Sequence, residues 1–530
     1  MATLAPSRRA WTLPAPAAGS ARAFGMLAFG GLLALSVLLR TRDFDSGFWI
    51  DEGLSVGIAD RPLADIPDAL RLDGSPPLYY ALLHGWIALA GRSEEATHAL
   101  SLLFAVLAVP ATWWAVRGVF GTRAGWMGAL LAATNPFLTQ YAQETRMYAL
   151  VVLLGVLACG AFARAYALAG TDREPTRTQR RRWAAAFGLA LAALLYTHNW
   201  ALFFGAGCGA VWLGLLAAAP GSSRRELLIG GAVGFGGALA LYAPWIPTLL
   251  FQVQHTGAPW STAPSLTDLI GVPGRVLGTG AQLALLLAAG AGLMAVIDRR
   301  QPRHAAKRRA MVTLLALFVA TVLAAWVASQ VSPAWASRYL AVALPPLLLA
   351  VAAGLAHAGR LGLVGAVLVA VIWAGDGAPS QKSNVREIAD AIAPSVRPGD
   401  IVVSTQPEQV PVLRYYLPEG LRYATLWGPV SDVGVTDWRD GVQRMRTTDA
   451  ERDLEPLLAA LPPGRRLVLF EPIFNDLSRW QAPWTELIRV RSTEWRQYVS
   501  NDQRLTATAV RPPDVQPGRN LLRATVLVKG

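Results

Sequence analysis

The chain has 530 residues, of which 53% are hydrophobic and only 16% are charged, and its mean hydropathy is +0.36. Since soluble globular proteins carry about a quarter charged residues, this composition excludes an ordinary soluble protein and indicates one that lies largely in lipid. Residues 377–530 hold 20 Lys and Arg against 18 Asp and Glu, so most of the net charge of +13 belongs to the apolar part of the chain. There it falls mainly in short loops and accompanies no nucleic-acid-binding motif, which argues against nucleic acid as a partner.

Residues 24–376 contain one apolar run after another. A helix needs roughly 20 apolar residues to cross the hydrocarbon core of a bilayer. About eleven membrane-spanning helices are predicted on this basis, at 24–40, 98–116, 124–140, 147–169, 184–198, 199–219, 227–249, 276–297, 310–331, 339–358 and 361–376. The predicted fold class is therefore an α-helical polytopic membrane protein, with a short N-terminal segment, residues 1–23, and a soluble C-terminal domain, residues 377–530.

Clusters of basic residues set the orientation of these helices, because Lys and Arg gather in the cytoplasmic loops of membrane proteins. Residues 76–90 are apolar but short and begin with two prolines. If this segment lies in the interface instead of crossing, all the clusters share one side of the membrane. They lie at Arg8–Arg22, Arg117–Arg123, Arg173–Arg182, Arg224-Arg225, Arg299–Arg309 and Arg360. We therefore expect a multi-pass protein of the cell membrane with a cytoplasmic N-terminus and an extracytoplasmic C-terminal domain.

An acidic pair, Asp51-Glu52, lies in the first external loop, within the sequence FWIDEGLSV. The flanking apolar side chains would hold this segment at the membrane interface as an amphipathic element. A carboxylate held there is suited to act as a general base towards an incoming hydroxyl group. The alternative is a solvated loop in which the pair is incidental, because the same loop contains several other aspartates.

Further polar residues are predicted on the same external face. Tyr79 and Tyr80 follow two prolines at the start of the interfacial segment, and tyrosine suits a membrane interface. Arg146 opens the fourth span, His198 ends the fifth, and Arg338-Tyr339 opens the tenth. A guanidinium group is a planar fork that suits phosphate, and a phosphate at a membrane interface usually belongs to a lipid. The alternatives are that each arginine only reaches towards the headgroups and that the histidine is a hydrogen-bonded helix end.

The C-terminal domain has an alternating pattern. Residues 384–394 and 451–461 have helical periodicity, while 400–405, 465–471 and 521–529 have the composition of buried strands. This alternation predicts a small α/β domain. The domain is expected to recognise an acceptor or to close over the site, or else to act as a stabilising cap without a chemical role. Its tryptophans are expected either to stack on sugars or to form a core. These tryptophans include Trp427, Trp438, Trp480, Trp484 and Trp495.

The order of five motifs resembles glycosyltransferase family 39. The motifs are the Asp51-Glu52 pair, PPLYY at 76–80, ETRMYAL at 144–150, YTHNW at 196–200 and SRYL followed by PP at 337–346. This family belongs to the membrane-embedded GT-C superfamily, which includes protein mannosyltransferases and the aminoarabinose transferases of lipid A. The resemblance covers roughly residues 24–376.

The resemblance implies a glycosyltransferase with a polyprenyl-phosphate sugar donor and an extracytoplasmic acceptor that is a glycan, a protein or a lipid. Asp51 then matches the catalytic aspartate, and Glu52 orients the site or helps to hold a metal. A divalent cation held by these two carboxylates stays open. Arg146, His198 and Arg338 are implied to bind the donor phosphate, with Tyr79, Tyr80 and Tyr339 beside the donor lipid. Cationic donors fit a lipid phosphate that leaves with a developing negative charge.

Two other functions remain open from the sequence. A transporter or flippase of lipid-linked glycans would also span the membrane many times, but transporters tend to carry polar or broken helices near the middle of the bilayer and to have paired halves. Here the distinctive polar residues gather at one face, and the sequence has no evident internal repeat. The other alternative is a membrane scaffold whose external domain binds a partner, in which case the acidic pair would be expendable.

Overall fold

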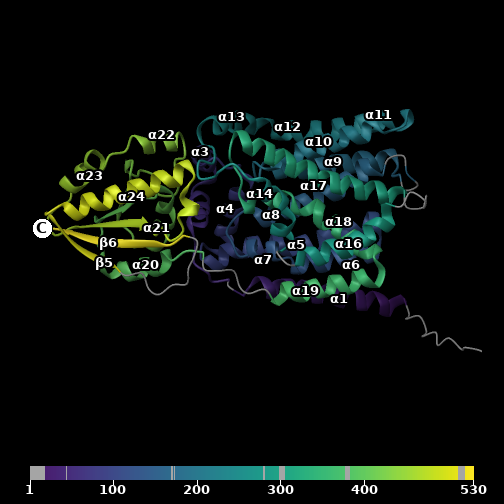
Figure 1. Ribbon diagram of the computed structural model, residues 1–530, viewed down its shortest axis with the longest axis horizontal. Helices are drawn as coiled ribbons and strands as arrows, with labels where there is room; N and C mark the ends of the chain where they lie inside the picture. The colour runs from purple at the N-terminus through teal and green to yellow at the C-terminus, as the bar shows by residue number, and fades with distance from the viewer. Residues whose placement is uncertain are drawn as a thin grey trace, which may run out of the picture.

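The computed structural model of the chain describes residues 18–42, 44–168, 171, 174–278, 281–297, 305–375, 382–510 and 520–530. It consists of a bundle of long helices and a domain built on a mixed β-sheet, which lies at one end of the bundle (Figure 1). Residues 1–17 and the predicted domain boundary at 376–377 lie outside the described residues.

Each of the eleven apolar segments predicted from the sequence contains a helix in the part that the structure describes. The bundle helices are α1 (Ala18–Arg40), α5 (Glu94–Phe120), α6 (Thr122–Thr134), α7 (Pro136–Tyr141), α8 (Tyr148–Phe162), α9 (Arg177–Leu195), α10 (Ala201–Ala217), α11 (Gly221–Gly231), α12 (Gly237–Tyr242), α13 (Ile246–His255), α16 (Ala281–Ile297), α17 (Ala305–Val331), α18 (Leu344–His357) and α19 (Gly359–Gly375). The segment predicted at 124–140 is broken at Asn135, whose side chain accepts a hydrogen bond from the backbone of Leu138 and so begins α7.

Short π-helical or 3₁₀ turns join several of these helices. They are η2 (Ala163–Ala167), η3 (Ala232–Gly236), η4 (Ala243–Trp245) and η6 (Ser337–Val342). Because η3 and η4 continue α11 into α12 and α13, the helical stretch Ser223–His255 becomes 33 residues long.

Within the residues that the structure describes, five helical stretches are long and apolar enough to cross a bilayer, namely Arg22–Arg40, Glu94–Phe120, Tyr148–Ala167, Ser223–His255 and Ala305–Val331. Shorter apolar helices, such as α16 and α18, pack beside them. Large apolar side chains on the outside of the bundle are exposed; Leu27 is 76% exposed and Leu287 is 75% exposed. Lipid would cover such a surface, so the helical part is a multi-pass membrane bundle.

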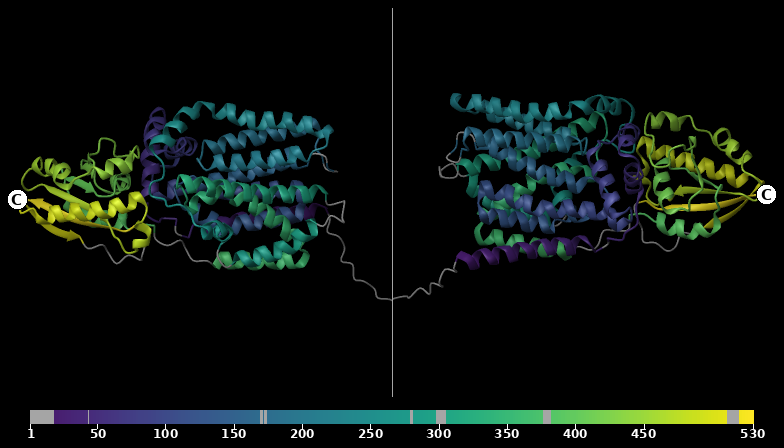
Figure 2. Two further views of the ribbon diagram at one scale, coloured as in Figure 1. Left: turned by 45° about the horizontal axis from the view of Figure 1, so that its top comes forward. Right: turned by 180° about the vertical axis from the view of Figure 1, so that it is seen from behind.

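The connection between α1 and α5 forms a group of short helices at the end of the bundle that faces the sheet domain (Figures 1 and 2). It contains α2 (Ile50–Ala59), η1 (Leu63–Asp65), α3 (Ile66–Asp73) and α4 (Leu78–Ala90). The segment predicted to lie in the interface corresponds to α4. At 13 residues this helix is about 20 Å long, which is too short to cross the hydrocarbon core.

The C-terminal part has one six-stranded sheet with the order β3-β2-β1-β4-β6-β5. The strands are β1 (Ile401–Ser404), β2 (Arg422–Thr425), β3 (Gly428–Pro429), β4 (Arg466–Pro472), β5 (Leu505–Val510) and β6 (Leu522–Lys529). Strand β1 pairs in parallel with β2 and β4, while β3, β5 and β6 are antiparallel to their neighbours. The α/β prediction is confirmed, including the strands at 400–405, 465–471 and 521–529, whereas β2, β3 and β5 were not predicted.

Helices cover both faces of this sheet. They are α20 (Val385–Ile392), α21 (Val410–Tyr416), α22 (Gly441–Arg446), α23 (Ala450–Ala459) and α24 (Pro483–Asn501), with the turns η7 (Ala393–Ser395), η8 (Pro407–Gln409) and η9 (Leu477–Trp480). Two short helices, α14 (Leu266–Ile270) and α15 (Val272–Leu277), belong to the bundle side. Trp484 and Trp495 are fully buried beneath the sheet, which answers the question left open by the sequence: these two tryptophans form core.

The sheet domain is packed tightly against α2. Any side chain at Gly53 would collide with the backbone of Val412 in α21, and one at Gly57 would collide with the carbonyl oxygen of Gly434. Further polar contacts cross the same junction, including the ion pair between Arg386 and Glu94. Because glycine lets two backbones approach this closely, the domain and the helix that carries the acidic pair are held as one unit.

Candidate active site

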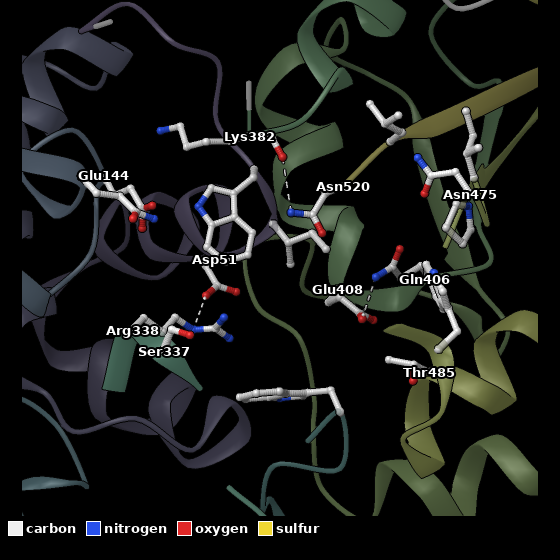
Figure 3. Close-up of a pocket in the computed structure, with 18 of the residues that line it drawn as sticks. Asp51, Glu144, Ser337, Arg338, Lys382, Gln406, Glu408, Asn475, Thr485 and Asn520 are labelled. Carbon is white, nitrogen blue, oxygen red and sulfur yellow. Dashed lines mark hydrogen bonds and ion pairs between the residues drawn. The ribbon is translucent and has the colours of Figure 1, made fainter. Parts of the chain in front are cut away.

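A cavity of about 720 Å³ lies between the bundle and the sheet domain. Its volume is within the range of about 300–1,000 Å³ that holds small-molecule ligands. Asp51 and Arg338 lie on one side of it, and Gln406 and Glu408 of the sheet domain lie on the other (Figure 3). The sheet domain is therefore part of the wall of the cavity, which favours acceptor recognition or closure over the site above a stabilising cap without a chemical role.

Asp51 lies in the first turn of α2 and lines the cavity. Its Oδ2 atom is 3.6 Å from Nε of Arg338 and 3.8 Å from Nη2 of Arg146. Its side chain keeps 18% exposure, so the carboxylate is reachable from the cavity. The structure thus brings together three of the predicted site residues, which come from positions 51, 146 and 338 of the chain.

Arg338 lies in the turn η6, at the start of the tenth predicted span, and lines the cavity. Its guanidinium carbon is 4.9 Å from the ring centre of Trp260 and 5.5 Å from that of Trp49. These rings orient the guanidinium group by cation–π contact without using its N–H donors. Such a group can still donate hydrogen bonds to an anion in the cavity.

Arg146 is more deeply placed than Arg338. Its Nη1 atom donates to Oγ of Ser55 at 3.0 Å and to the carbonyl oxygen of Asp51 at 3.3 Å. The side chain is almost fully buried and does not line the cavity. Its geometry therefore suits positioning of the Asp51 helix turn more than direct contact with a donor phosphate.

Glu52 is adjacent to Asp51 in sequence but points away from the cavity into a buried ion cluster. Its Oε1 accepts hydrogen bonds from Nε2 of His98 at 2.7 Å and from the backbone N–H of Thr145 at 2.8 Å. Its Oε2 accepts one from Nζ of Lys382 at 2.7 Å. Burial by itself would raise the pKa of Glu52, but the charges and hydrogen bonds of Lys382 and His98 outweigh it and lower the pKa to about 2. Glu52 is therefore a permanent carboxylate that ties α2 to α5 and to the sheet domain.

Sequence reasoning did not find His98 and Lys382 as members of this cluster. His98 lies on the apolar helix α5, and its Nδ1 atom is 2.8 Å from the carbonyl oxygen of Phe44. Lys382 begins the described part of the C-terminal region. The sequence indicated these residues only through their chemistry. A buried carboxylate needs a cation, and a histidine on an apolar helix usually has a hydrogen-bond partner.

Glu144 also lines the cavity. The sequence indicated this residue only as the first position of the ETRMYAL motif. Burial raises the pKa of its carboxyl group to about 7, although the nearby charge of Lys382 opposes this. Its Oε2 atom is buried without a hydrogen-bond partner among the described residues. A carboxyl group that titrates near neutrality at the edge of the cavity is a group that can exchange protons there.

The remaining predicted residues lie beside the site but do not line the cavity. His198 accepts a hydrogen bond at Nδ1 from the backbone N–H of Trp200, which places its proton on Nε2 and fits the helix-end alternative. Tyr339 packs against it, with 4.7 Å between ring centres. Tyr79 and Tyr80 are fully buried, so they do not form an interfacial belt. Both side chains belong to α4, and the hydroxyl of Tyr80 lies 3.5 Å from Nη1 of Arg146.

The two carboxylates do not fit a shared divalent cation. Asp51 and Glu52 point to different sides of α2, and Glu52 already has protein donors on both oxygens, one of them a lysine. Within the part of the chain that the structure describes, no group of three or more His, Cys, Asp or Glu side chains is arranged to hold a metal. The Asp51-Glu52 pair therefore does not form a site for a divalent cation.

No protein-family model matches the sequence, and a comparison with curated proteins finds no similar sequence. The fold nevertheless has solved counterparts. A helical bundle joined to a sheet domain is found over nearly the whole chain in solved structures of other proteins, and the chain has their fold.

Three solved structures illustrate the similarity. ArnT from Cupriavidus metallidurans in the apo state is 14% identical in sequence, with a TM-score of 0.62 over 96% of this chain and 98% of that chain. The same enzyme bound to undecaprenyl phosphate gives a TM-score of 0.59 at 13% identity, over 95% and 98% of the two chains. The oligosaccharyltransferase AglB from Archaeoglobus fulgidus, in complex with an inhibitory peptide and a dolichol-phosphate, gives 0.53 at 12% identity, over 84% and 70%. At these identities the likeness concerns the fold.

Proposed function

We propose that the protein is a glycosyltransferase that moves a sugar from a polyprenyl-phosphate donor to a hydroxyl group of an acceptor in the cavity. The observation that carries this proposal is the placement of the Asp51 carboxylate beside Arg338 in a cavity at the end of a membrane bundle. The similarity to ArnT bound to undecaprenyl phosphate and to AglB bound to a dolichol-phosphate supports a lipid phosphate as the donor class.

The chemistry requires a base and a cation. The acceptor oxygen forms a bond to the anomeric carbon while the bond from that carbon to the phosphate oxygen breaks. Asp51 takes the proton of the acceptor hydroxyl, and the bonding electron pair leaves with the polyprenyl phosphate. Arg338 stabilises the negative charge that develops on this leaving group. Arg146 positions the first turn of α2 by donating hydrogen bonds to the carbonyl oxygen of Asp51 and to Oγ of Ser55.

The orientation in the membrane is part of the proposal. The basic clusters of the sequence favour a cytoplasmic position for the end of the bundle that is remote from the sheet domain. The N-terminal end of α1 and the helix α11, which carries Arg224 and Arg225, lie at that end (Figure 1). The cavity and the sheet domain would then face the outside of the cell membrane.

The test is the release of undecaprenyl phosphate from an undecaprenyl-phosphate sugar, with the purified protein in proteoliposomes and a cell-envelope extract as the acceptor source. Removal of a general base typically costs about 10²–10⁴-fold in rate, so Asp51→Asn should lower the release by that factor. Asp60→Asn is the matched control, because Asp60 ends the same helix and pairs with the exposed Arg92 outside the cavity. Full activity of Asp51→Asn would refute its role as a base. Movement of the intact donor across the bilayer without release would instead indicate a flippase.

A further inference from the structure

The two walls of the cavity differ in charge. Three cations line the cavity, namely Arg42 and Arg338 from the bundle side and Lys382 from the start of the sheet domain, where its Nζ atom donates to Glu52. Among the described lining residues from the sheet domain beyond Lys382, none is Lys or Arg. Their polar side chains are amides, one hydroxyl and one carboxyl, supplied by Gln406, Glu408, Asn475, Thr485 and Asn520.

Glu408 is the central polar group of this second wall. Its Oε1 atom accepts hydrogen bonds from Nε2 of Gln406 at 2.9 Å and from Nε1 of Trp484 at 3.0 Å, which fix the orientation of the carboxyl group. Its Oε2 atom is buried and has no hydrogen-bond partner among the described residues. The side chain is more than nine-tenths buried and lines the cavity (Figure 3). A buried oxygen without a partner costs free energy unless a ligand donates a hydrogen bond to it.

Flat aromatic rings complete the same wall. Trp438 and Trp480 of the sheet domain line the cavity, as do Trp49 and Trp260 of the bundle side. Trp438 is held by ring contact with Trp484, at 5.0 Å between ring centres, and Trp480 by an edge-to-face contact with Phe474 at 4.6 Å. The sequence left open whether the tryptophans of the sheet domain bind sugars or form core, and these two line the cavity.

We propose that the wall of the sheet domain, with Glu408 at its centre, is the acceptor subsite and that it takes a neutral saccharide. This inference rests on the proposed function, since it names the class of the acceptor. Sugar hydroxyl groups donate to a carboxylate and exchange hydrogen bonds with amides, while the C–H face of a pyranose or furanose ring packs on tryptophan. A phosphorylated acceptor is disfavoured, because its charge would meet the carboxyl group of Glu408, while Lys382, the one cation among the described lining residues of this domain, is already paired with Glu52.

The position of the subsite fits the reaction. The donor phosphate belongs with the cations of the bundle side, and an acceptor held by Glu408 then lies between that donor and the sheet domain, with its hydroxyl group directed to Asp51. The close packing of Gly53 on Val412 fixes the acceptor wall relative to the Asp51 helix. Glu408 is a specificity-determining residue that binds the acceptor, and it takes no part in the proton transfer.

Direct binding tests this proposal without relying on turnover. The purified protein in nanodiscs is titrated with neutral trisaccharides of glucose, mannose, galactose and arabinose, with undecaprenyl phosphate as the donor-side probe. A serine- and threonine-rich peptide and lipid A represent the other acceptor classes. Tryptophan fluorescence and calorimetry follow the binding. At least one neutral trisaccharide should bind, and the peptide and lipid A should not compete with it.

Glu408→Gln should weaken the binding of that trisaccharide by at least about tenfold, which is what the loss of one hydrogen bond to a charged group implies. Trp480→Ala should also weaken it, because this change removes the ring on which the C–H face of the sugar packs. Both variants should bind undecaprenyl phosphate as the wild type does. Glu419→Gln is the matched control, because Glu419 is a carboxyl group of the same domain with 84% side-chain exposure, away from the cavity. Elution volume and melting temperature report whether each variant folds.

Each other result overturns the inference. Failure of all neutral saccharides to bind, binding that both variants leave unchanged, or preferred binding of the peptide or of lipid A would exclude this subsite. The proposed function fails separately. If the trisaccharide binds through Glu408 while Asp51→Asn keeps full transfer, the base is wrong and the subsite stands. If undecaprenyl phosphate is released only with the peptide as acceptor, the transferase stands and the saccharide subsite falls.

Discussion

The first turn of α2 separates two regions of opposite character, the cavity on one side and the buried ion cluster on the other. Asp51 faces the cavity, with two arginines at 3.6 and 3.8 Å and 18% of its side chain exposed. Glu52 faces the cluster, with no exposure and direct hydrogen bonds from His98 and Lys382. Two neighbouring carboxylates thus have different tasks: the one with loose contacts remains available to a ligand, and the one with tight contacts holds the structure together.

The largest expected effect on stability concerns the ion cluster. Glu52→Gln leaves Lys382 nearly buried without its carboxylate, and breaking a buried ion pair by removing one partner typically costs about 3–5 kcal/mol. The melting temperature of the purified protein should therefore fall strongly, whereas that of Asp51→Asn should not fall. Equal melting temperatures for the two variants would abolish the distinction between the two regions.

The pH dependence of the same cluster has a defined sign. The pKa of Glu52 is lowered from 4.5 to about 2, so its stabilising contribution is fully present above pH 4.5 and is lost as the pH falls towards 2. The melting temperature of the wild type should decrease more steeply over this interval than that of Glu52→Gln. Parallel curves would indicate that the ion cluster does not contribute.

A smaller effect is expected on the cavity side, at Arg338. Removal of the guanidinium group in Arg338→Gln deletes charge-assisted hydrogen bonds to the donor phosphate, which are worth about 1.5–3 kcal/mol each, or roughly 10–100-fold in donor affinity. Arg338→Lys should fall between this variant and the wild type, because it keeps the charge but not the planar fork. Titration with undecaprenyl phosphate measures the affinity. A normal affinity in Arg338→Gln would contradict the assignment of the phosphate to this side of the cavity.

The smallest expected effect belongs to Glu144, which lies near both regions. Its pKa is raised from 4.5 to about 7, so the folded state favours the protonated form. The stability associated with it is fully present below pH 4.5 and is lost as the pH rises through 7. Glu144→Gln should therefore raise the melting temperature at pH 8, by an amount that corresponds to about 1–3 kcal/mol, and should change it little at pH 4.5. The opposite trend would show that Glu144 is charged and paired in the folded protein.

The bundle was accessible to prediction because hydropathy acts locally along the chain. The apolar segments stand out in a window of about 20 residues, and the short length and prolines of 76–90 separate α4 from the spanning helices. The sheet was only partly accessible. Strands β1 and β4 contain continuous apolar runs, and β6 begins with alternating apolar and polar residues. In contrast, β3 has two residues and β2 begins at an exposed arginine, so neither carries a strong pattern.

The site was partly predictable for a different reason. The sequence predicted that Asp51, Arg146 and Arg338 lie on one face of the membrane. This prediction needs only the order of the spans and the positions of the basic clusters. The direction of each side chain could not be predicted, because it depends on packing between remote segments. Glu52 and Lys382 are 330 positions apart in sequence and 2.7 Å apart in space. The same holds for Glu408, whose relation to Asp51 exists only because the sheet domain packs on α2.

The approach of Gly53 to Val412 and of Gly57 to Gly434 also limits how the chain can be shortened or recombined. A chain that ends after α19 would expose the surface of α2 around Gly53 and Gly57, and it would leave the buried carboxylate of Glu52 without the ammonium group of Lys382. Such a truncated chain should be recovered as an aggregate and not as a minimal enzyme. A chimera that takes its sheet domain from another protein would need a matching backbone surface opposite both glycines. The two halves of this protein are therefore expected to have been inherited together.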